Sequence, residues 1–305
     1  MLRSLLLLTA LISTPPLAAA ADPYVVILGV AQDAGHPQAA CQKSCCKLAF
    51  DDPSKGHLVA AAAIVDPDSR ERWLLDVGPD VRSQLHWLDE NAPGEGIDGI
   101  LLTHAHIGHY TGLTHFGHEV MGAKDVPVYA MERMRAFLKE NGPWSQLVSY
   151  KNITLKDLED GTPVQLNPRI RVTPLAVPHR DEFSETVGFR IEGPNHSVFY
   201  LPDIDKWAKW ATPIEGVIAS VDAAFLDGTF YENGEIEGRD MAEIGHPFIE
   251  ESLARFKALP PKERDKIRFI HLNHTNPALD PAGAANQAVR AAGMRVAQEG
   301  EAVSL

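Results

Sequence analysis

Basic residues and cysteines are scarce in this 305-residue sequence. It has 28 Lys and Arg against 41 Asp and Glu, a net charge of −13, and only three cysteines. An acidic balance argues against nucleic acid or an anionic membrane as the main partner. It leaves open a small anionic substrate, because a bound metal can reverse the local field. Internal repeats, low-complexity tracts beyond the first twenty residues and clear linkers are also lacking, which favours an ordinary globular protein.

The first residues are "MLRSLLLLTALISTPPLAAAADP". One basic residue precedes a leucine-rich run, two prolines and a string of alanines, which is the pattern of a secretory signal peptide cleaved before Ala21 or Asp22. The apolar run is too short to span a membrane, and no cysteine follows the alanines to carry a lipid anchor. The sequence therefore predicts a signal peptide over residues 1–21, a single domain over residues 22–305, and a periplasmic or secreted protein.

Short apolar runs bounded by Gly, Pro, Asp and Asn recur along the chain and predict β-strands. They cover residues 24–30, 58–65, 72–78, 98–104, 126–131, 170–177, 185–191, 197–203, 223–228 and 267–273. Helix-like segments lie between them, at residues 79–90, 111–121, 132–141, 247–257 and 281–292. Strands in two sets, each followed by helices, predict an α/β fold with two sheets packed face to face and helices outside.

Three histidines crowd the stretch "ILLTHAHIGHYTGL", residues 100–113. His104 and His106 alternate by two, so on an extended segment both point to the same side. His109 follows three residues later, where a helix can begin as the strand ends. A strand end can therefore aim three imidazoles into one cleft, and neutral imidazole suits zinc and several other transition metals.

This stretch resembles the His-x-His-x-Asp-His signature of the metallo-β-lactamase superfamily. Other segments resemble the motifs of that family in the same order: "WLLDVGPD", "LAVPHR", "FYLPDID" and "FIHLNHTNP". The resemblance covers nearly all of the mature chain and implies a four-layer αββα sandwich with metals at one edge of the sheets. It implies that His104, His106, His179 and Asp203 hold a first metal, that His109, His271 and the shared Asp203 hold a second, and that Asp76 lies close to both.

Two branches of the family resemble this chain most. "FLDGTFY", "GHPFIEES" and "FIHLNHTNP" are similar to the PQQ-biosynthesis protein B family. The intact histidines and a cysteine cluster near the N-terminus are similar to the phosphonate-pathway cyclic phosphodiesterases. The protein B family commonly lacks the first two motif histidines, and PQQ synthesis is intracellular. The presence of His104 and His106 and the predicted export therefore favour a hydrolase.

Gly108 departs from the family pattern, which has a metal-binding aspartate at this position. The second site is then short of one ligand, and we expect Gly108→Asp to restore it. Asp33, in "GVAQDAGHPQ", is the candidate to reach in from elsewhere. The alternative for Asp33 is a turn in which its carboxylate binds its own backbone before Ala-Gly.

All three cysteines lie in "HPQAACQKSCCKLAF". An odd number in an exported protein leaves two hypotheses open. One is a disulfide between Cys41 and Cys45, which an oxidising compartment favours. The other is a structural zinc held by Cys41, Cys45, Cys46 and His274, the pairing of a cysteine cluster and a late histidine that the resembling phosphodiesterases use.

The sequence as a whole predicts a metal-dependent hydrolase that uses a metal-bound hydroxide on an ester, lactone, amide or phosphodiester bond of a small molecule. We expect one or two zinc ions in the active site, with manganese or iron as alternatives. Asp203 would orient the hydroxide, and Asp33, Asp76 or solvent would transfer the proton. The alternatives are an iron-dependent oxygenase similar to the protein B family and a non-catalytic metal- or ligand-binding protein. The substrate, the oligomeric state and the role of His246 stay open.

Overall fold

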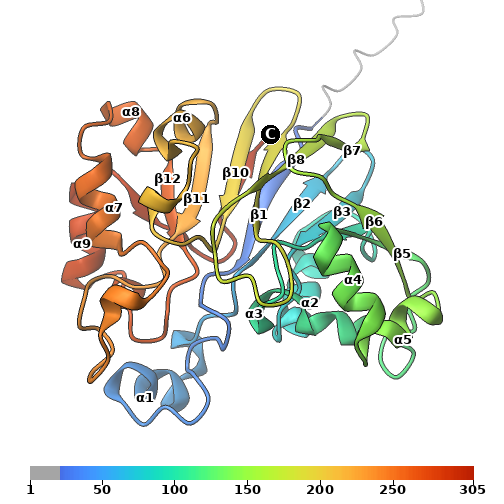
Figure 1. The fold of residues 1–305 in the computed structure, drawn as a ribbon, viewed down its shortest axis with the longest axis horizontal. Helices are drawn as coiled ribbons and strands as arrows, with labels where there is room; N and C mark the ends of the chain where they lie inside the picture. The colour runs from blue at the N-terminus through green and yellow to red at the C-terminus, as the bar shows by residue number, and fades with distance from the viewer. Residues whose placement is uncertain (1–20) are drawn as a thin grey trace, which may run out of the picture.

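The computed structural model describes residues 21–305, so the predicted signal peptide lies outside the described residues except for Ala21. Two seven-stranded sheets form the centre of the molecule (Figure 1). In sheet order, the first contains β14 (Ala302–Ser304), β1 (Tyr24–Gly29), β2 (Ala61–Asp66), β3 (Glu71–Leu75), β4 (Gly99–Leu101), β5 (Val126–Ala130) and β6 (Ile153–Asp157). The second contains β13 (Arg295–Val296), β12 (Ile267–Ile270), β11 (Ala223–Asp227), β10 (Ser197–Leu201), β9 (Val187–Glu192), β8 (Ile170–Ala176) and β7 (Val164–Asn167).

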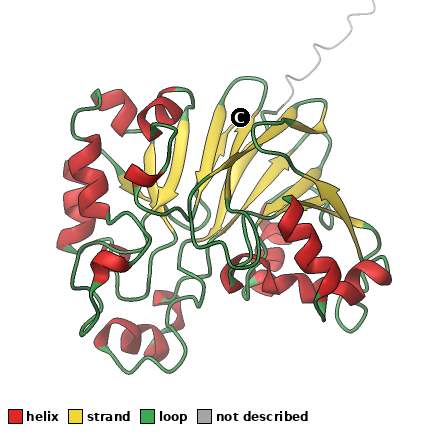
Figure 2. Cartoon of the chain, in the orientation of Figure 1, coloured by secondary structure: helices red, strands yellow, loops and turns green. Residues whose placement is uncertain are grey.

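Helices cover the outer face of each sheet, as the red ribbons on both sides of Figure 2 show. The first sheet carries α2 (Val81–Asn91), α3 (Ile107–Tyr110), α4 (Glu132–Glu140) and α5 (Trp144–Ser149). The second carries α6 (Ile214–Ala219), α7 (Ile249–Phe256), α8 (Pro261–Arg264) and α9 (Ala284–Ala291). A separate helix, α1 (Ser44–Asp51), extends below the sheets in Figure 1. The four-layer αββα sandwich predicted from the sequence is confirmed.

Alternation along single strands builds this layering. In β1, Val25 and Ile27 pack between the two sheets, whereas Val26 packs under the helices of the first sheet. In β11, Phe225 packs between the sheets, whereas Leu226 packs under the helices of the second. Successive side chains of a strand point to opposite faces, so strands that are apolar throughout, as these are, can be buried on both. Each such side chain contributes about 1.5–3 kcal/mol to folding.

One predicted helix is wrong in extent. The segment expected to be helical over residues 111–121 forms only a short 3₁₀ helix, Thr111–Phe116, which leaves His118 outside any helix. Gly112 explains part of this, because a Cβ there would lie 2.2 Å from the carbonyl oxygen of Gly78. The segment is thus fixed by close backbone packing rather than by an amphipathic helix. Further 3₁₀ turns lie at Pro53–Lys55, Trp207–Lys209, Met241–Glu243 and Pro277–Leu279.

Several short elements show no pattern in the sequence that predicts them, namely α1, α5, α6, α8, β6, β7, β13 and β14. The edge strand β6 shows the reason, since its residues are half-buried or exposed after Ile153 and give no apolar run. Within residues 21–305, no helix has the length and hydrophobicity that a membrane crossing requires.

Candidate metal centre

The ends of parallel strands bring the predicted site together. Strands β3 and β4 run parallel in the first sheet, and β10, β11 and β12 run parallel in the second. Asp76 follows β3, His104 follows β4, Asp203 follows β10, Asp227 ends β11 and His271 follows β12. Because the carboxyl ends of parallel strands meet at one edge of a sheet, these residues converge there.

The first cluster consists of His104, His106, His179 and Asp203, whose ligand atoms lie within 4.8 Å of one another. His179 Nε2 lies 3.3 Å from His106 Nδ1 and 3.7 Å from Asp203 Oδ1. His104 Nε2 lies 3.5 Å from Asp203 Oδ2. Two ligands of a tetrahedral zinc, each about 2.1 Å from the ion, are about 3.4 Å apart. The spacing of the first cluster therefore fits a metal ion.

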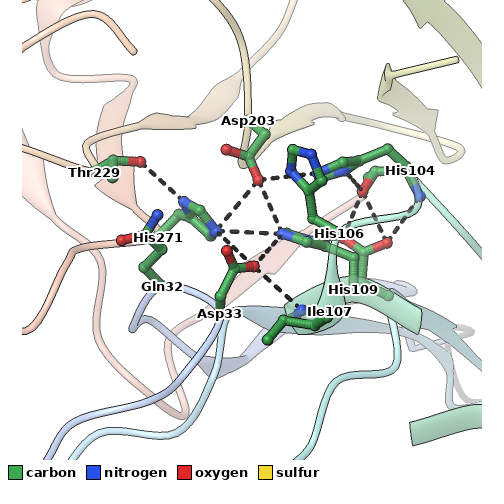
Figure 3. A network of polar contacts seen from close by, with 12 residues as sticks. Gln32, Asp33, His104, His106, Ile107, His109, Asp203, Thr229 and His271 are labelled. Atoms are coloured by element: carbon green, nitrogen blue, oxygen red, sulfur yellow. Dashed lines mark hydrogen bonds and ion pairs between the residues drawn. The ribbon is translucent and has the colours of Figure 1, made fainter. Parts of the chain in front are cut away.

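The second cluster consists of His109, His271 and Asp33, whose ligand atoms also lie within 4.8 Å of one another. The Nε2 atoms of His109 and His271 are 3.2 Å apart, and Asp203 Oδ2 lies 2.9 Å and 3.3 Å from them. Figure 3 shows Asp203 and Asp33 approaching this pair of histidines from two sides. Asp203 thus lies between the two clusters, as expected of a residue that bridges two metals.

Unsatisfied buried atoms support a metal at this place. Within the described residues, His104 Nε2 and both carboxylate oxygens of Asp203 are buried without a hydrogen-bond partner. A buried carboxylate is costly unless it is hydrogen-bonded, paired or bound to a metal. The donor set, imidazole nitrogens with carboxylates, is the one that zinc and other transition metals take. The residues present therefore fit a metal centre.

Asp76 orients two of these histidines from behind. Its Oδ2 accepts a hydrogen bond from His109 Nδ1 at 2.8 Å, and its Oδ1 accepts one from Thr103 N at 2.8 Å. The hydroxyl of Thr103 donates to Asp76 and lies 2.9 Å from His104 Nδ1. Both rings are thereby held with Nε2 toward the cluster, as hydrogen-bonded partners of metal-binding histidines do. Asp76 does not line the pocket described below, so the structure places it behind the ligands.

Asp227, which was not predicted from the sequence, plays for the second sheet the role that Asp76 plays for the first. It orients two histidines from behind. Its Oδ1 accepts from the Thr229 hydroxyl at 2.7 Å, and that hydroxyl lies 2.9 Å from His271 Nδ1. Its Oδ2 lies 2.8 Å from His246 Nδ1. Each sheet therefore contributes one buried aspartate and one threonine that together orient two histidines. An aspartate at the end of a buried strand, followed two residues later by threonine, was the available signal.

Burial and neighbouring charges shift the pKa values of the histidines in different directions. Burial lowers the pKa of His104 well below its usual value and lowers that of His179 to about 4. Burial also opposes protonation of His109, but Asp76 and Asp203 outweigh it and raise its pKa well above the usual value. Burial raises the pKa of the Asp203 carboxyl, yet the surrounding histidines lower it well below its usual range. The metal-free centre thus holds neutral imidazoles at His104 and His179 and a protonated one at His109, around the ionised carboxylate of Asp203.

A cavity of about 400 Å³ opens onto the centre. Its lining includes His106, His179, Asp203, Asp33 and His246. His246, whose role the sequence left open, therefore faces this pocket.

Three cations also line the pocket, namely Arg180, Lys209 and Arg239. Arg190 and Lys206, which also come near motif residues in the sequence, are not among the residues that line it. Arg190 donates instead to Ser220, and Lys206 pairs with Glu251.

The cysteines gather elsewhere. The ligand atoms of Cys41, Cys45, Cys46 and His274 lie within 4.8 Å of one another, and all three thiols are unpaired. The sulfurs of Cys41 and Cys45 are 4.0 Å apart, close to the separation of about 3.8 Å between two thiolates on one tetrahedral zinc. His274 Nδ1 is buried and lacks a hydrogen-bond partner among residues 21–305. This arrangement fits a zinc site and contains no disulfide.

Comparisons with known families and sequences agree with this geometry. The family described as the beta-lactamase superfamily domain matches residues 71–272. Coenzyme PQQ synthesis protein B of Methylorubrum extorquens (strain PA1) is 28% identical over 309 residues, covering 92% of this chain and 100% of that protein. The protein of the same name from Xanthomonas campestris pv. campestris (strain B100) is 25% identical over 306 residues, covering 92% of this chain and 99% of that protein.

Two solved structures extend the likeness. Zn²⁺-bound PqqB from Methylobacterium extorquens superposes with a TM-score of 0.78 and 26% identity, covering 92% of this chain and 100% of that one. A diphosphatase from the PhnP family superposes with a TM-score of 0.69 over 93% of this chain and 98% of that one, and its 21% identity makes it a likeness of fold. These relatives match both branches that the sequence resembles.

Proposed function

This chain belongs to the beta-lactamase superfamily, and on that premise we propose that it is a metal-dependent hydrolase with a two-metal centre. The observation that carries the proposal is the pair of ligand clusters that share Asp203, whose two oxygens are buried without a hydrogen-bond partner among the described residues. We assign a first metal to His104, His106, His179 and Asp203. We assign a second to His109, His271 and the same aspartate.

Zinc is the proposed metal, with manganese or iron as alternatives, since all three accept imidazole and carboxylate ligands. A bound metal would polarise the oxygen under attack and lower the pKa of its water to about 7. The protein supplies the geometry around it. Asp76 and Asp227 hold four histidine rings in place, and the pocket admits a small molecule beside them.

Proton transfer is assigned to groups that face this pocket. His246 lines it with Nδ1 held by Asp227, and this position supports a role in giving a proton to the leaving group. Asp33 lines it as well, whereas Asp76 is engaged by Thr103 and His109. Proton transfer therefore falls to His246, Asp33 or solvent. The substrate is proposed to carry an ester, lactone, amide or phosphodiester bond.

Replacing single metal ligands tests the assignment. His104→Ala and His179→Ala should each remove active-site metal and hydrolysis while the fold persists, because both residues lie at a sheet edge. His196→Ala is the matched control, since His196 is half-exposed beside Asp222 at the opposite end of β10. Metal content by mass spectrometry, melting curves and turnover of generic esters and phosphodiesters are the readouts. Unchanged metal content and turnover in both ligand variants would refute the proposal.

A second candidate function is an iron-dependent oxygenase similar to PQQ synthesis protein B. Identity to that protein over nearly the whole chain favours it. Bound iron with oxygen-dependent turnover would support this candidate, whereas anaerobic hydrolysis with zinc or manganese supports the hydrolase. A protein that binds metal tightly but turns over neither class of substrate would be a non-catalytic binding protein.

For the cysteine cluster we propose a structural zinc held by Cys41, Cys45, Cys46 and His274. The unpaired thiols and the buried, unsatisfied His274 Nδ1 support it. We also propose that the chain is exported, with a signal peptide over residues 1–21 and one domain over residues 22–305. N-terminal sequencing of the protein from periplasm and culture medium tests this, and an uncleaved protein confined to the cytoplasm would contradict it.

A further inference from the structure

Asp33 lies beside the second cluster although it comes from a distant part of the sequence. It sits on the loop after β1, with Oδ1 3.5 Å from His109 Nε2 and 3.9 Å from His271 Nε2. These separations are close to the value of about 3.4 Å expected between two ligands of one tetrahedral metal. Without Asp33, the second metal would have only His109, His271 and the shared Asp203 as protein ligands.

The loop that carries Asp33 is fixed to the strand end that carries His271. Ala31 pairs with both Val59 and Leu272 in isolated β-bridges. The backbone N–H of Gln32 donates to the carbonyl of Leu272 at 2.8 Å, and the Asn273 side chain donates to Gln32 Oε1 at 2.6 Å. Asp33 is therefore held on a paired backbone segment next to one of its neighbours in the cluster.

The carboxylate of Asp33 is turned toward the histidine motif. Its Oδ1 accepts a hydrogen bond from the backbone N–H of Gly108 at 3.2 Å. The alternative drawn from the sequence, a turn closed by the Asp33 side chain, is not what forms, because the N–H of Gly35 donates to the carbonyl of Gln32 instead. The turn is made by the backbone alone, which leaves the carboxylate available to the cluster.

Gly108 makes room for this arrangement. A Cβ at Gly108 would lie 2.4 Å from Asp33 Oδ1 and 2.5 Å from Asp33 Cα. Any side chain at position 108 would thus collide with the residue that occupies the space, and our expectation that Gly108→Asp supplies the missing ligand is wrong for this reason. The glycine at position 108 is therefore what allows the carboxylate of Asp33 to lie beside the second cluster.

We propose that Asp33 is the fourth protein ligand of the second metal and takes the place of the aspartate that the histidine motif lacks. This inference rests on the proposed two-metal centre. The ligand comes from the loop after β1 instead of the turn after β4, but it reaches the same cluster. The class of ligand is unchanged, a single carboxylate beside two imidazoles, so the second site is complete for a divalent transition metal.

The test compares metal binding by Asp33→Asn with that of the unaltered mature protein. Both are stripped of metal, titrated with Zn²⁺ in competition with a chromogenic chelator, and analysed for metal content. Asparagine keeps the shape of the side chain but removes its charge. Loss of groups that merely orient a ligand typically weakens metal binding about 10–100-fold, so loss of a direct ligand should weaken one site by about 100-fold or more. Asp205→Asn is the matched control, because Asp205 lines the same pocket but pairs with Lys209.

A second variant separates the position of Asp33 from its charge. Gly108→Ala removes no ligand, yet its Cβ must displace Asp33, so it should weaken the same site. Gly112→Ala is its control, since a Cβ there would meet Gly78 O at 2.2 Å and strain the motif turn without touching Asp33. It should lower the melting temperature and keep the metal.

The outcomes are distinguishable. One metal fewer in Asp33→Asn than in the unaltered protein, with a normal melting curve, supports the inference. Equal metal content and affinity in the two overturns it and leaves the two-metal centre standing. If the unaltered protein itself holds fewer than two active-site metals, the proposed centre fails and Asp33 loses its role with it.

Discussion

Replacing Asp76 with asparagine should weaken metal binding without removing any ligand. Asp76 Oδ1 accepts from the backbone N–H of Thr103 at 2.8 Å, and Oδ2 accepts from His109 Nδ1 at 2.8 Å. An amide offers one acceptor and one donor. If its oxygen keeps the bond to Thr103, its NH₂ group faces His109 Nδ1, which must then accept. The proton of His109 moves to Nε2, the atom that faces the second cluster, and that atom can no longer bind a metal.

The size of the effect follows from the contacts that are lost. A hydrogen bond to a charged group contributes about 1.5–3 kcal/mol, so Asp76→Asn should cost about 2 kcal/mol and lower the melting temperature by about 4–8 °C. Loss of the group that orients a metal-binding histidine should weaken the second metal about 10–100-fold. Titration of the stripped protein with Zn²⁺ and calorimetric melting measure the two quantities separately.

Asp66→Asn is the control for stability alone. Asp66 is another fully buried aspartate at a strand end, bonded to Asn167 at 2.9 Å and Arg169 at 2.8 Å. It should lose similar stability and keep both metals. Asp76→Asn could instead lower the melting temperature while both active-site metals bind as before. Asp76 would then serve the fold only, and the proposed shift of the His109 proton to Nε2 would be refuted.

Three further predictions concern the same centres. Cys45→Ser and His274→Ala should each lose one zinc and melt at lower temperature with the active-site metals unchanged, because a structural zinc contributes folding free energy directly; a Cys41–Cys45 disulfide found by mass spectrometry in fresh protein would contradict this. Asp227→Asn should weaken the second metal, as judged by Zn²⁺ titration, because one amide oxygen cannot accept both from Thr229, which orients His271, and from His246. The second metal should bind more weakly as the pH falls, by up to about tenfold per unit, because it must displace the proton that Asp76 and Asp203 hold on His109 against the effect of burial; affinity independent of pH between 6 and 8 would argue against it.

The same proton acts in the opposite sense on the metal-free protein. The folded pKa of His109 lies above the ordinary value of 6.5, so its protonation stabilises the fold. That stabilisation is fully present below pH about 6.5 and is lost as the pH rises through the raised pKa. The metal-free and metal-loaded proteins should therefore differ in the pH dependence of melting, which separates the two states in one experiment.

The sheets were predictable because their strands are apolar on both faces. All ten apolar runs contain or overlap an observed strand, since burial between a second sheet and a helix layer leaves no polar alternation. The edge strand β6 and the helix α6 were not predicted, because neither has a long apolar run. Each is short, and its position is decided by packing against neighbours that are distant in the sequence.

The ligands were predictable only through motifs. The spacing of His104 and His106 by two residues predicts that both point to the same side. His179, Asp203 and His271 are separated by tens of residues and meet only after folding. Resemblance to a family supplied that folded order. Asp227 lies in "FLDGTFY", which resembles the protein B family as a segment, but its own role carried no separate signal. One aspartate at a strand end resembles many others until its partners are known.

Position 108 shows why the motif alone misjudged the second cluster. A motif records which residue types follow one another, but a metal responds to donor atoms at a fixed distance, whatever segment carries them. The loop after β1 and the turn after β4 reach the same edge of the first sheet, so a carboxylate can be supplied from either. Only one of the two can carry it, because a Cβ at Gly108 would collide with Asp33. A glycine at position 108 and an aspartate at position 33 are therefore coupled by sterics. Gly108 does not leave the second cluster short of a ligand, because it makes room for the carboxylate of Asp33.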